Sequence, residues 1–533
     1  MQHTLGIIRP CHLGLYPVVF QACLINNATV RLYIDWGSFM SNMSGHMTIN
    51  AMLVTFSAAA TLVVEIAAGR MLAPYVGMSL YTWTAIIATV LAGLTLGNFF
   101  GGIAYRPGNA RVNGMVMACM FAVAALATAA APSLLQALAP GLSNDNSPVR
   151  SILVLSLATF FVPSLCLGLV SPIATSLAQE RAQRPALVLG VFFGLGAAGS
   201  IIGTLLAGYV FIGFIGSHGT MAAMAALDMV LAGLALTLGR GIWPAISMLA
   251  LSMLLAALLA SWPALAAGKL CDRESDYYCI RVIEEEPGKR FMVLDHLVHG
   301  FNDRDDPSRL YSPYVALMDM LASKHVGPGK SAYFVGGGAY TLPRAWGHSH
   351  PKMRLTIAEV DPVVTEMAQA KLWYKPSDET TIIHGDGRAG LRQLTTPQDV
   401  IIGDAFHDLS VPQHLTTTEF AREVADKLSY DGLYLLNIVD HAQKPRFMLS
   451  VLKSLAEVFP NVQVYSDQNA LRQWGRTTFV LAASSQPLVT ELTIGTNEFF
   501  AWPSLMIAQF NQNLMPLKLT DDFSPVDRLL LKP

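Results

Sequence analysis

Long apolar stretches fill the first half of the chain, whereas short alternating runs fill the second half. A helix needs about 20 mostly apolar residues to cross the hydrocarbon layer of a membrane. Seven stretches reach that length, and they predict a multi-span α-helical membrane domain of about seven helices. They cover residues 49–69, 80–103, 112–132, 151–176, 187–214, 218–239 and 242–265.

After residue 267 the pattern changes to strand-like runs such as SAYFVGG, RLTIAEV and DVIIGDAF, separated by helical stretches such as PVVTEMAQAKLW. Strands that alternate with helices predict an α/β Rossmann-like domain with a doubly wound, largely parallel sheet. A β-hairpin around Pro287-Gly288 is expected before it. The predicted parts are an N-terminal segment (1–46), a transmembrane domain (47–266), a hairpin and linker subdomain (267–330) and the Rossmann-like domain (331–533).

Charge follows the same division. Residues 47–266 hold 11 charged residues and residues 267–533 hold 58. The net charge of −2 gives no electrostatic reason to expect a nucleic-acid partner. Residues 1–46 lack a signal-peptide pattern, and a misassigned start with Met47 as the initiator would explain them. The six cysteines show no zinc-site spacing, so no metal is expected.

Few polar groups interrupt the predicted spans. Six glycines in the fifth span favour close helix packing over a substrate path. Glu65 lies at membrane depth, where a carboxylate is costly unless it is paired or faces a polar cavity, and Arg70 is its natural partner. The pair predicts either a structural ion pair or a functional site at the membrane interface. Asp228 is a weaker case of the same kind.

The orientation of the predicted membrane domain is ambiguous. With seven spans, five arginines flank one side and two flank the other, which would put the second half of the chain outside the cell. A disulfide between Cys271 and Cys279 would agree, because disulfides persist in oxidising compartments. The donor class inferred below is cytosolic, and it shifts the expectation to a multi-pass protein of the cell (inner) membrane with a cytoplasmic domain.

Three acids stand where successive strands of the predicted sheet end. Glu359 ends the second strand, Asp386 follows the third and Asp404 ends the fourth, while the glycines of GGGAY follow the first. Ligands bind at the carboxyl ends of such strands, near the point where the strand order reverses. A carboxylate there accepts ribose hydroxyls or an adenine amino group. An acidic pocket without a GxGxxG motif or a Walker lysine repels pyrophosphate, and so favours S-adenosylmethionine or its decarboxylated form.

The order of these motifs identifies a family resemblance. GGG, AEVDP, GDGRAGL and DVIIGDAF, preceded by the hairpin and LDHLVHG, resemble spermidine synthase, an aminopropyltransferase family with a methyltransferase-like Rossmann fold. The resemblance covers roughly residues 275–485. The stretches DAFHDLSVPQHLTTTEF and TDDFSPVDRLL resemble the membrane-fused branch of that family, in which a multi-span domain comes first.

The resemblance implies residue roles in donor binding. Glu359 would hold the ribose and Asp386, with Gly387 beside it, the adenine. The glycine loop would lie against the donor's tail, and this part of the predicted site comprises Gly336, Gly337 and Gly338.

The acceptor side of the resembled site is altered. Asp404 matches the acid that takes a proton from the attacking amine, and Tyr314, or failing that Tyr311, matches the tyrosine that positions the amine. His299 stands where the family has a glutamine. The family's GGGDG loop carries an acid where this chain has Ala339. The second acid of the family's DSSDP motif is replaced by His407, which Asp408 follows.

Three functions follow from these expectations. The first is a membrane aminopropyltransferase that uses decarboxylated S-adenosylmethionine, a small-molecule amine or polyamine as acceptor, and membrane lipid as its surroundings. The second uses S-adenosylmethionine itself, for methylation or for cleavage to methylthioadenosine. The third is a transporter or sensor with a nucleoside-binding or polyamine-binding domain, supported by Glu65 and Arg70. The resemblance also implies a homodimer.

Overall fold

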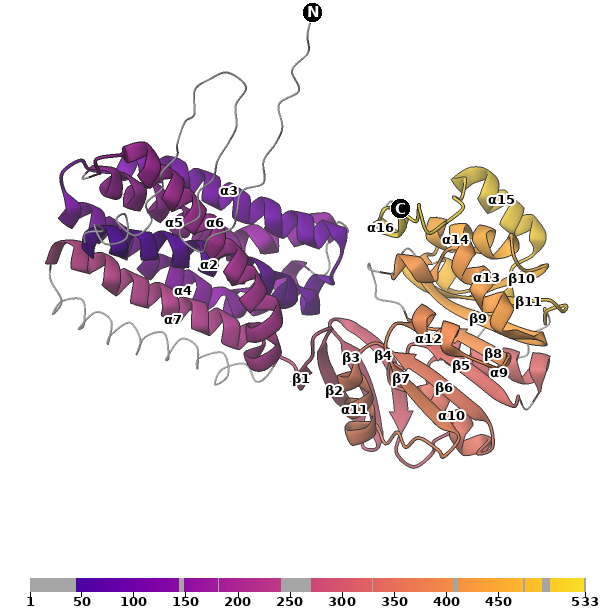
Figure 1. The fold of residues 1–533 in the computed structure, drawn as a ribbon. Helices are drawn as coiled ribbons and strands as arrows, with labels where there is room; N and C mark the ends of the chain where they lie inside the picture. The colour runs from indigo at the N-terminus through magenta and orange to yellow at the C-terminus, as the bar shows by residue number, and fades with distance from the viewer. Residues whose placement is uncertain are drawn as a thin grey trace, which may run out of the picture.

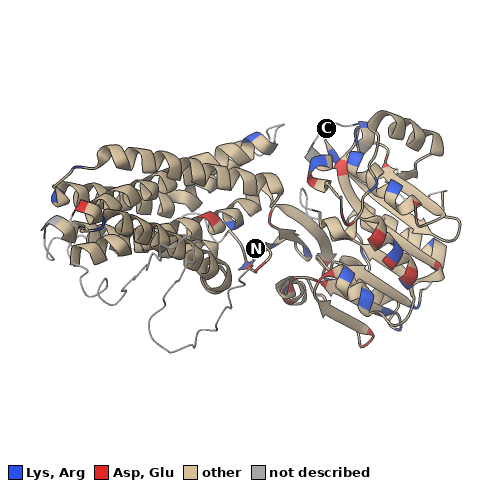
Figure 2. Cartoon of the chain, turned by 45° about the horizontal axis from the view of Figure 1, so that its top comes forward, with Lys and Arg blue, Asp and Glu red and all other residues tan. Residues whose placement is uncertain are grey.

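The chain folds into a helical lobe and an α/β lobe (Figure 1). The computed structural model describes residues 45–142, 148–180, 182–240, 270–327, 329–405, 411–472, 475–490 and 499–531. The helices up to α7 (Ile212–Arg240) form the first lobe, and the strands from β1 (Arg273–Glu274) onward form the second. Charged residues are sparse along the first lobe and frequent along the second (Figure 2). Residues 1–44 and the predicted span 242–265 lie outside these described ranges, whereas Met47 is in the first described helix.

The helical lobe contains five stretches in its described part that are long and apolar enough to cross a membrane. The fifth and sixth predicted spans form one continuous stretch, Pro185–Leu238, which bends at Gly216 (φ 69°). Gly216 has non-helical backbone angles and divides that stretch where the predicted break stands, and the seventh predicted span, 242–265, lies outside the described residues, so the predicted number of seven stays a prediction. The elements are α2 (Gly45–Val76), α3 (Leu80–Ala104), α4 (Ala110–Leu142), α5 (Pro148–Glu180), α6 (Pro185–Leu206), a π-helical turn η1 (Ala207–Phe211) and α7.

Two of the six glycines in the fifth predicted span bring helices together. A Cβ atom at Gly199 would lie 2.1 Å from the carbonyl oxygen of Thr55, and one at Gly203 would lie 2.4 Å from that of Ala59. Only glycine allows α6 to approach the backbone of α2 so closely, which confirms the predicted close packing at these two positions. The other glycines do not share this role: Gly190, Gly194 and Gly208 have nothing within 4 Å, and Gly196 only touches Val54.

A four-stranded antiparallel sheet opens the α/β lobe, in the order β1-β2-β3-β4. The strands β2 (Cys279–Glu286) and β3 (Lys289–Leu294) pair across the turn that contains Gly288 (φ 86°), and β4 (Leu297–Asp303) pairs with β3. A disulfide joins Cys271 to Cys279, with the two Cα atoms 5.3 Å apart. This cross-link ties the start of the lobe to the first residue of β2.

The second sheet has eight strands in the order β12-β10-β11-β9-β8-β5-β6-β7. The five strands from β7 to β9 are parallel, while β11, β10 and β12 pair antiparallel at one edge. The predicted largely parallel sheet is thus confirmed for its central part. The strands are β5 (Ser331–Val335), β6 (Arg354–Glu359), β7 (Thr380–His384), β8 (Gln398–Gly403), β9 (Leu428–His441), β10 (Asn461–Asp467), β11 (Arg476–Ser484) and β12 (Phe499–Ala501).

Helices cover both faces of this sheet, and two apolar cores fill the space between them. The strand order reverses between β5 and β8, so a crevice forms at the carboxyl ends of these two strands. The helices are α9 (Pro313–Val326), α10 (Thr341–Ser349), α11 (Pro362–Lys371), α12 (Gly387–Gln393), α13 (Thr418–Lys427), α14 (Arg446–Ala456), α15 (Ser504–Leu514) and α16 (Val526–Leu531), with short 3₁₀ turns η2 (Gln413–Leu415) and η3 (Ala470–Arg472).

Candidate functional site

A two-lobed pocket lies at the crevice predicted by the strand order. The larger lobe has a volume of about 270 Å³ and the smaller one about 30 Å³. Both are lined by His299, Gly336 and Asp404, so the two lobes adjoin at these residues. The larger lobe also includes Glu359, Asp386, Gly387, Gly338, Tyr277, Tyr278 and His414. The smaller lobe includes Tyr314, Gly337, Met318 and Thr341.

The glycine loop forms one wall of this pocket because its backbone takes conformations that side chains would block. Gly336 and Gly338 have φ values of 96° and 51°, and a Cβ at Gly336 would lie 2.7 Å from the carbonyl oxygen of Asp404. Ala339, in contrast, is buried in the core beside Gly300 and lines neither lobe. Its side chain therefore does not occupy the place that the sequence resemblance gave to a donor-binding acid.

Glu359 ends β6 at the floor of the larger lobe. Its Oε2 accepts hydrogen bonds from the backbone N–H groups of Gly337 at 2.8 Å and Gly338 at 3.3 Å, and its Oε1 accepts one from Asp361 at 3.0 Å. Burial raises the pKa of this carboxyl above its usual value, although the three hydrogen bonds oppose the shift. The bonds fix the carboxylate at the strand end, next to the glycine loop.

Asp386 follows β7 and caps α12, and its Oδ1 accepts a hydrogen bond from the N–H of Ala389 at 2.9 Å. Its Oδ2 lies 2.6 Å from Nε2 of His414. Burial alone would raise the pKa of Asp386, but the bonds from Ala389 and His414 outweigh it and lower the pKa. The sequence reasoning missed His414. The signal available was a histidine in the same PQHLTT stretch that carried the family resemblance.

Asp404 stands where the two lobes meet, and its carboxylate has two side-chain donors. The Nδ2 of Asn437 donates to Oδ1 at 2.7 Å, and the hydroxyl of Tyr314 donates to Oδ2 at 3.2 Å. Burial raises the pKa of Asp404, partly opposed by these two bonds, and burial beside Asp404 raises the pKa of Tyr314 as well. Asn437 was missed, although an asparagine inside the apolar strand GLYLLNIV was visible in the sequence.

The side-chain oxygen of the buried Asn437 amide accepts no hydrogen bond from a described residue and is shielded from solvent. A buried polar atom without a partner is costly, so such atoms often mark a place that a ligand completes. Asn437, however, lines neither lobe, so its role in the site is to hold the Asp404 carboxylate from behind.

Of the remaining predicted site residues, some line the pocket and others do not. Tyr314 contacts Asp404, whereas the hydroxyl of Tyr311 donates to Asp303 at 2.6 Å and Tyr311 lines neither lobe. The structure therefore selects Tyr314 of the two predicted tyrosines. His299 lines both lobes, in agreement with its predicted place. His407 and Asp408 lie outside the described residues.

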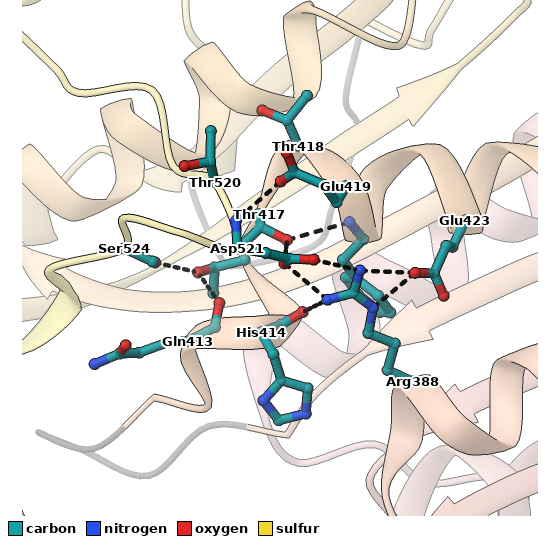
Figure 3. A network of polar contacts seen from close by, with 12 residues as sticks. Arg388, Gln413, His414, Thr417, Thr418, Glu419, Glu423, Thr520, Asp521 and Ser524 are labelled. Carbon is teal, nitrogen blue, oxygen red and sulfur yellow. Dashed lines mark hydrogen bonds and ion pairs between the residues drawn. The ribbon is translucent and has the colours of Figure 1, made fainter. Parts of the chain in front are cut away.

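A network of charges supports the Asp386 side of the pocket from outside (Figure 3). The buried Arg388, two residues after Asp386, donates to both carboxylate oxygens of Asp521 at 2.8 Å and to Glu423 at 2.8 Å. It also donates to the carbonyl oxygen of His414 at 3.1 Å. Through Arg388, the C-terminal residue Asp521 is linked to His414, whose ring contacts Asp386 in the pocket. The role of Asp521 had no counterpart in the sequence reasoning beyond the family resemblance of TDDFSPVDRLL.

Arg70 links the helical lobe to the opposite wall of the pocket. Its Nη1 donates to the carbonyl oxygen of Tyr277 at 2.5 Å, and its Nη2 donates to that of Ser275. The hydroxyl of Ser275 donates in turn to Asp361, whose N–H donates to Glu359. The predicted ion pair between Glu65 and Arg70 is not formed, although both residues are described. Five residues on a helix turn the two side chains away from a common face.

We expect replacement of Arg70 by alanine to raise the donor KM about tenfold and to change kcat little. The substitution removes two charge-assisted hydrogen bonds that hold the segment carrying Tyr277 and Tyr278, both of which line the larger lobe. Steady-state kinetics of the full chain would measure this. Lysine, which keeps the charge but not the fork of donors, should restore part of the affinity. Arg111→Ala, an exposed arginine of α4, is the control, and a fall in kcat at constant KM would contradict the expectation.

Comparison with known proteins finds relatives of one kind. No protein-family model matches the chain. The polyamine aminopropyltransferase of Vibrio vulnificus is 27% identical over 273 residues, covering 48% of this chain and 85% of the relative. Polyamine aminopropyltransferase 1 of Aquifex aeolicus is 25% identical, covering 41% and 77% respectively. Among solved structures, a probable spermidine synthase from Corynebacterium glutamicum is 21% identical with a TM-score of 0.42, covering 47% of this chain and 95% of that one.

Proposed function

We propose, from its similarity to polyamine aminopropyltransferases, that this chain transfers an aminopropyl group from decarboxylated S-adenosylmethionine to an amine and releases methylthioadenosine. The observation that carries the proposal is the placement of Asp404 with Tyr314 and Asn437 between two pocket lobes, one of which is lined by Glu359 and Asp386. Such a transfer needs a carboxylate that acts as general base and a lobe large enough for the donor's nucleoside.

In this proposal the larger lobe takes the donor. Glu359 accepts the ribose hydroxyls at the end of β6, and Asp386 accepts the adenine amino group at the start of α12. Gly336 and Gly338 have positive φ angles, which favour glycine, and because glycine has no side chain the loop leaves space for the donor between Glu359 and Asp386. The donor's sulfonium carbon chain then points toward the junction of the lobes, where Asp404 stands.

The smaller lobe leads the amine to the donor. The amine nitrogen attacks the aminopropyl carbon next to sulfur, so a C–N bond forms while the C–S bond breaks and its electron pair stays on sulfur. The ammonium product loses one proton to the Asp404 carboxylate. Tyr314 and Asn437 hold that carboxylate in place. Sulfonium is already a good leaving group, so orientation and proton removal supply the catalysis.

The pH profile offers a test of the Asp404 role. Transfer requires the carboxylate form, so activity falls as the pH drops through the raised pKa of Asp404, at higher pH than for an ordinary aspartate. Asn437→Leu removes a hydrogen bond that lowers this pKa. We expect the acid limb of kcat/KM to move upward by on the order of one pH unit. Asn461→Leu, outside the pocket lining, is the control, and an unchanged limb in Asn437→Leu would contradict the assignment.

A second candidate is a reaction of S-adenosylmethionine itself, by methylation or by cleavage to methylthioadenosine. Asp404 is the only carboxylate among the described residues that line the smaller lobe, and Ala339 faces the core. A polyamine cation and a propylamine tail both prefer acidic partners. The scarcity of such partners in the described part of this lobe is the observation that favours the alternative.

One assay separates these functions. The purified full chain is incubated with either donor, with and without putrescine, and the released products are identified. Methylthioadenosine that forms only with the decarboxylated donor and an amine supports aminopropyl transfer. Methylthioadenosine formed without any amine supports cleavage, and S-adenosylhomocysteine supports methylation. The absence of all three products would remove the enzymatic proposal.

We also propose that the helical lobe is a multi-pass domain of the cell membrane with the α/β lobe in the cytoplasm, where the donor is made. The disulfide between Cys271 and Cys279 favours the other face, because such bonds persist where conditions are oxidising. Labelling of these cysteines in intact cells with a membrane-impermeant thiol reagent, before and after reduction, decides between the two. Labelling without permeabilisation would overturn the cytoplasmic placement.

A further inference from the structure

The helical lobe contains a cavity that the proposed reaction does not use. It has a volume of about 700 Å³ and lies between α2, α3, α5 and α6. On α2 it extends from Val54 to Leu62, whereas Arg70, which contacts the α/β lobe, is further along the same helix. At 1.5 Å per helical residue, Thr61 and Arg70 are separated by roughly 13 Å along the axis. The cavity is therefore distinct from the pocket at Asp404.

Polar side chains reach the cavity in rows along two helices. Ser57 and Thr61 of α2 are four residues apart, and so are Ser171, Thr175 and Gln179 of α5. Residues four apart share one face of a helix, so each row runs along the cavity wall. Hydroxyl and amide groups in a surrounding of apolar helices are expensive unless they have partners, and a volume this size leaves room for a ligand to provide them.

The hydrogen bonds already present determine what these groups can still offer. Ser57 donates its hydroxyl hydrogen to the carbonyl oxygen of Leu167 at 3.3 Å. Thr61 donates its hydroxyl hydrogen to the backbone carbonyl oxygen of Ser57 at 2.9 Å. Gln179 donates through Nε2 to the carbonyl oxygen of Pro185 at 3.1 Å. With their hydrogens engaged, the hydroxyls of Ser57 and Thr61 offer the cavity their oxygens as acceptors, whereas Gln179 keeps one further N–H beside its amide oxygen. The part of the wall at Ser57 and Thr61 therefore suits a ligand that donates hydrogen bonds.

Charge points in the same direction. No lysine, arginine or histidine is among the described residues that line the cavity. Glu65 lies one turn beyond Thr61 on the same face of α2, is only partly buried, and makes no ion pair with a described residue. The rings of Phe192 and Phe193 are also in the lining, and aromatic faces attract cations. A carboxylate, oxygen acceptors and aromatic rings together favour a cation over an anion.

We infer that the cavity between α2, α3, α5 and α6 is a second binding site, which takes a protonated alkylamine with its ammonium group at the hydroxyl oxygens of Ser57 and Thr61 and toward Glu65, one turn beyond the lining. The hydrocarbon part of such a ligand lies against the apolar side chains of the lining, including Leu94 and Phe193. This site goes beyond the proposed transfer reaction. It gives the helical lobe a ligand of its own, of the same chemical class as the proposed acceptor.

The test measures binding of radiolabelled putrescine to the purified full chain in lipid nanodiscs, in the absence of any donor. Ala197 of α6 lines the cavity and its neighbour Ala198 is exposed outside it, so Ala197→Phe and Ala198→Phe form a matched pair. We expect Ala197→Phe to remove one bound amine per chain and Ala198→Phe to bind as the unaltered chain does. Glu65→Gln should weaken the same site about tenfold, because it removes the charge but keeps the shape.

Two further measurements keep the outcome clear. Donor binding at the α/β lobe should be the same in Ala197→Phe and Ala198→Phe, which would show that both variants fold. Asp404→Asn should bind the amine in the cavity as the unaltered chain does. Absence of aminopropyl transfer by the unaltered chain, with cavity binding retained, would contradict the proposed reaction alone. Equal amine binding by Ala197→Phe and Ala198→Phe, or equal binding of an N-acetylated, uncharged analogue, would overturn the cavity site. So would a change in co-purifying lipid without a change in bound amine.

Discussion

Replacement of Asp404 by asparagine is expected to lower kcat by about 10²–10⁴-fold and to leave donor affinity nearly unchanged. The substitution removes the group that takes the proton from the amine but keeps the size of the side chain. Asp404 is at the junction of the two lobes, whereas Glu359 and Asp386 line the donor side. Single-turnover formation of methylthioadenosine and equilibrium binding of the donor would separate the two effects.

Two controls sharpen this test. Asp431→Asn, at an exposed position of β9, changes the same chemical group away from the pocket and should have no effect on kcat. Tyr314→Phe removes one of the two donors to Asp404 and should cost less than the loss of the carboxylate itself. If Asp404→Asn kept most of its activity, or lost donor binding in proportion to activity, Asp404 would not be the base.

The second large effect is expected from Arg388→Met. Arg388 is 7% exposed and bonds Asp521 through two nitrogens and Glu423 through a third. The arginine is buried, but Asp521 is exposed and Glu423 keeps its contact with Arg392, so the loss is smaller than for a fully buried ion pair, roughly 1–2 kcal/mol. We expect local opening of α12 to become on the order of tenfold more frequent. Amide hydrogen exchange of Gly390 and its neighbours in α12 would measure this in the full chain.

Donor affinity should fall together with that local stability. Arg388 also bonds the carbonyl oxygen of His414, whose ring contacts Asp386, so its loss loosens the side of the pocket proposed for adenine. The matched control is Arg392→Met, which removes an exposed arginine that contacts the same Glu423 and should change exchange much less. Equal effects of the two substitutions would show that burial of Arg388 is not the source of its contribution.

The comparisons confirm the family resemblance drawn from the order of the motifs, and the parallel pairing of β5 to β9 confirms the strands read from short apolar runs. These features were predictable because they depend on local patterns. Strand and helix periodicity, and the glycines and acids that follow a strand, are written in neighbouring residues. The same local reasoning placed Glu359, Asp386 and Asp404 at the carboxyl edge of one sheet.

Local reasoning failed where the deciding contact lies far away in the chain. Arg70 was assigned to Glu65, five residues away, but bonds Tyr277 and Ser275 across the lobe boundary. Of the two predicted tyrosines, Tyr314, which the sequence placed first, contacts Asp404, whereas Tyr311 bonds Asp303. The predicted break between the fifth and sixth spans, by contrast, coincides with Gly216, whose backbone angles are not helical.

By itself the sequence determined the two-part organisation, the central parallel strands, the glycine loop and the three strand-end acids, because each is encoded by the hydrophobic period of its own segment. Only the tertiary structure decided which side chains complete the site: Asn437 and Tyr314 on Asp404, His414 on Asp386, and Asp521 on Arg388. These partners are separated by 28 to 133 residues. No local pattern specifies such a pair, because its geometry depends on how whole strands and helices pack.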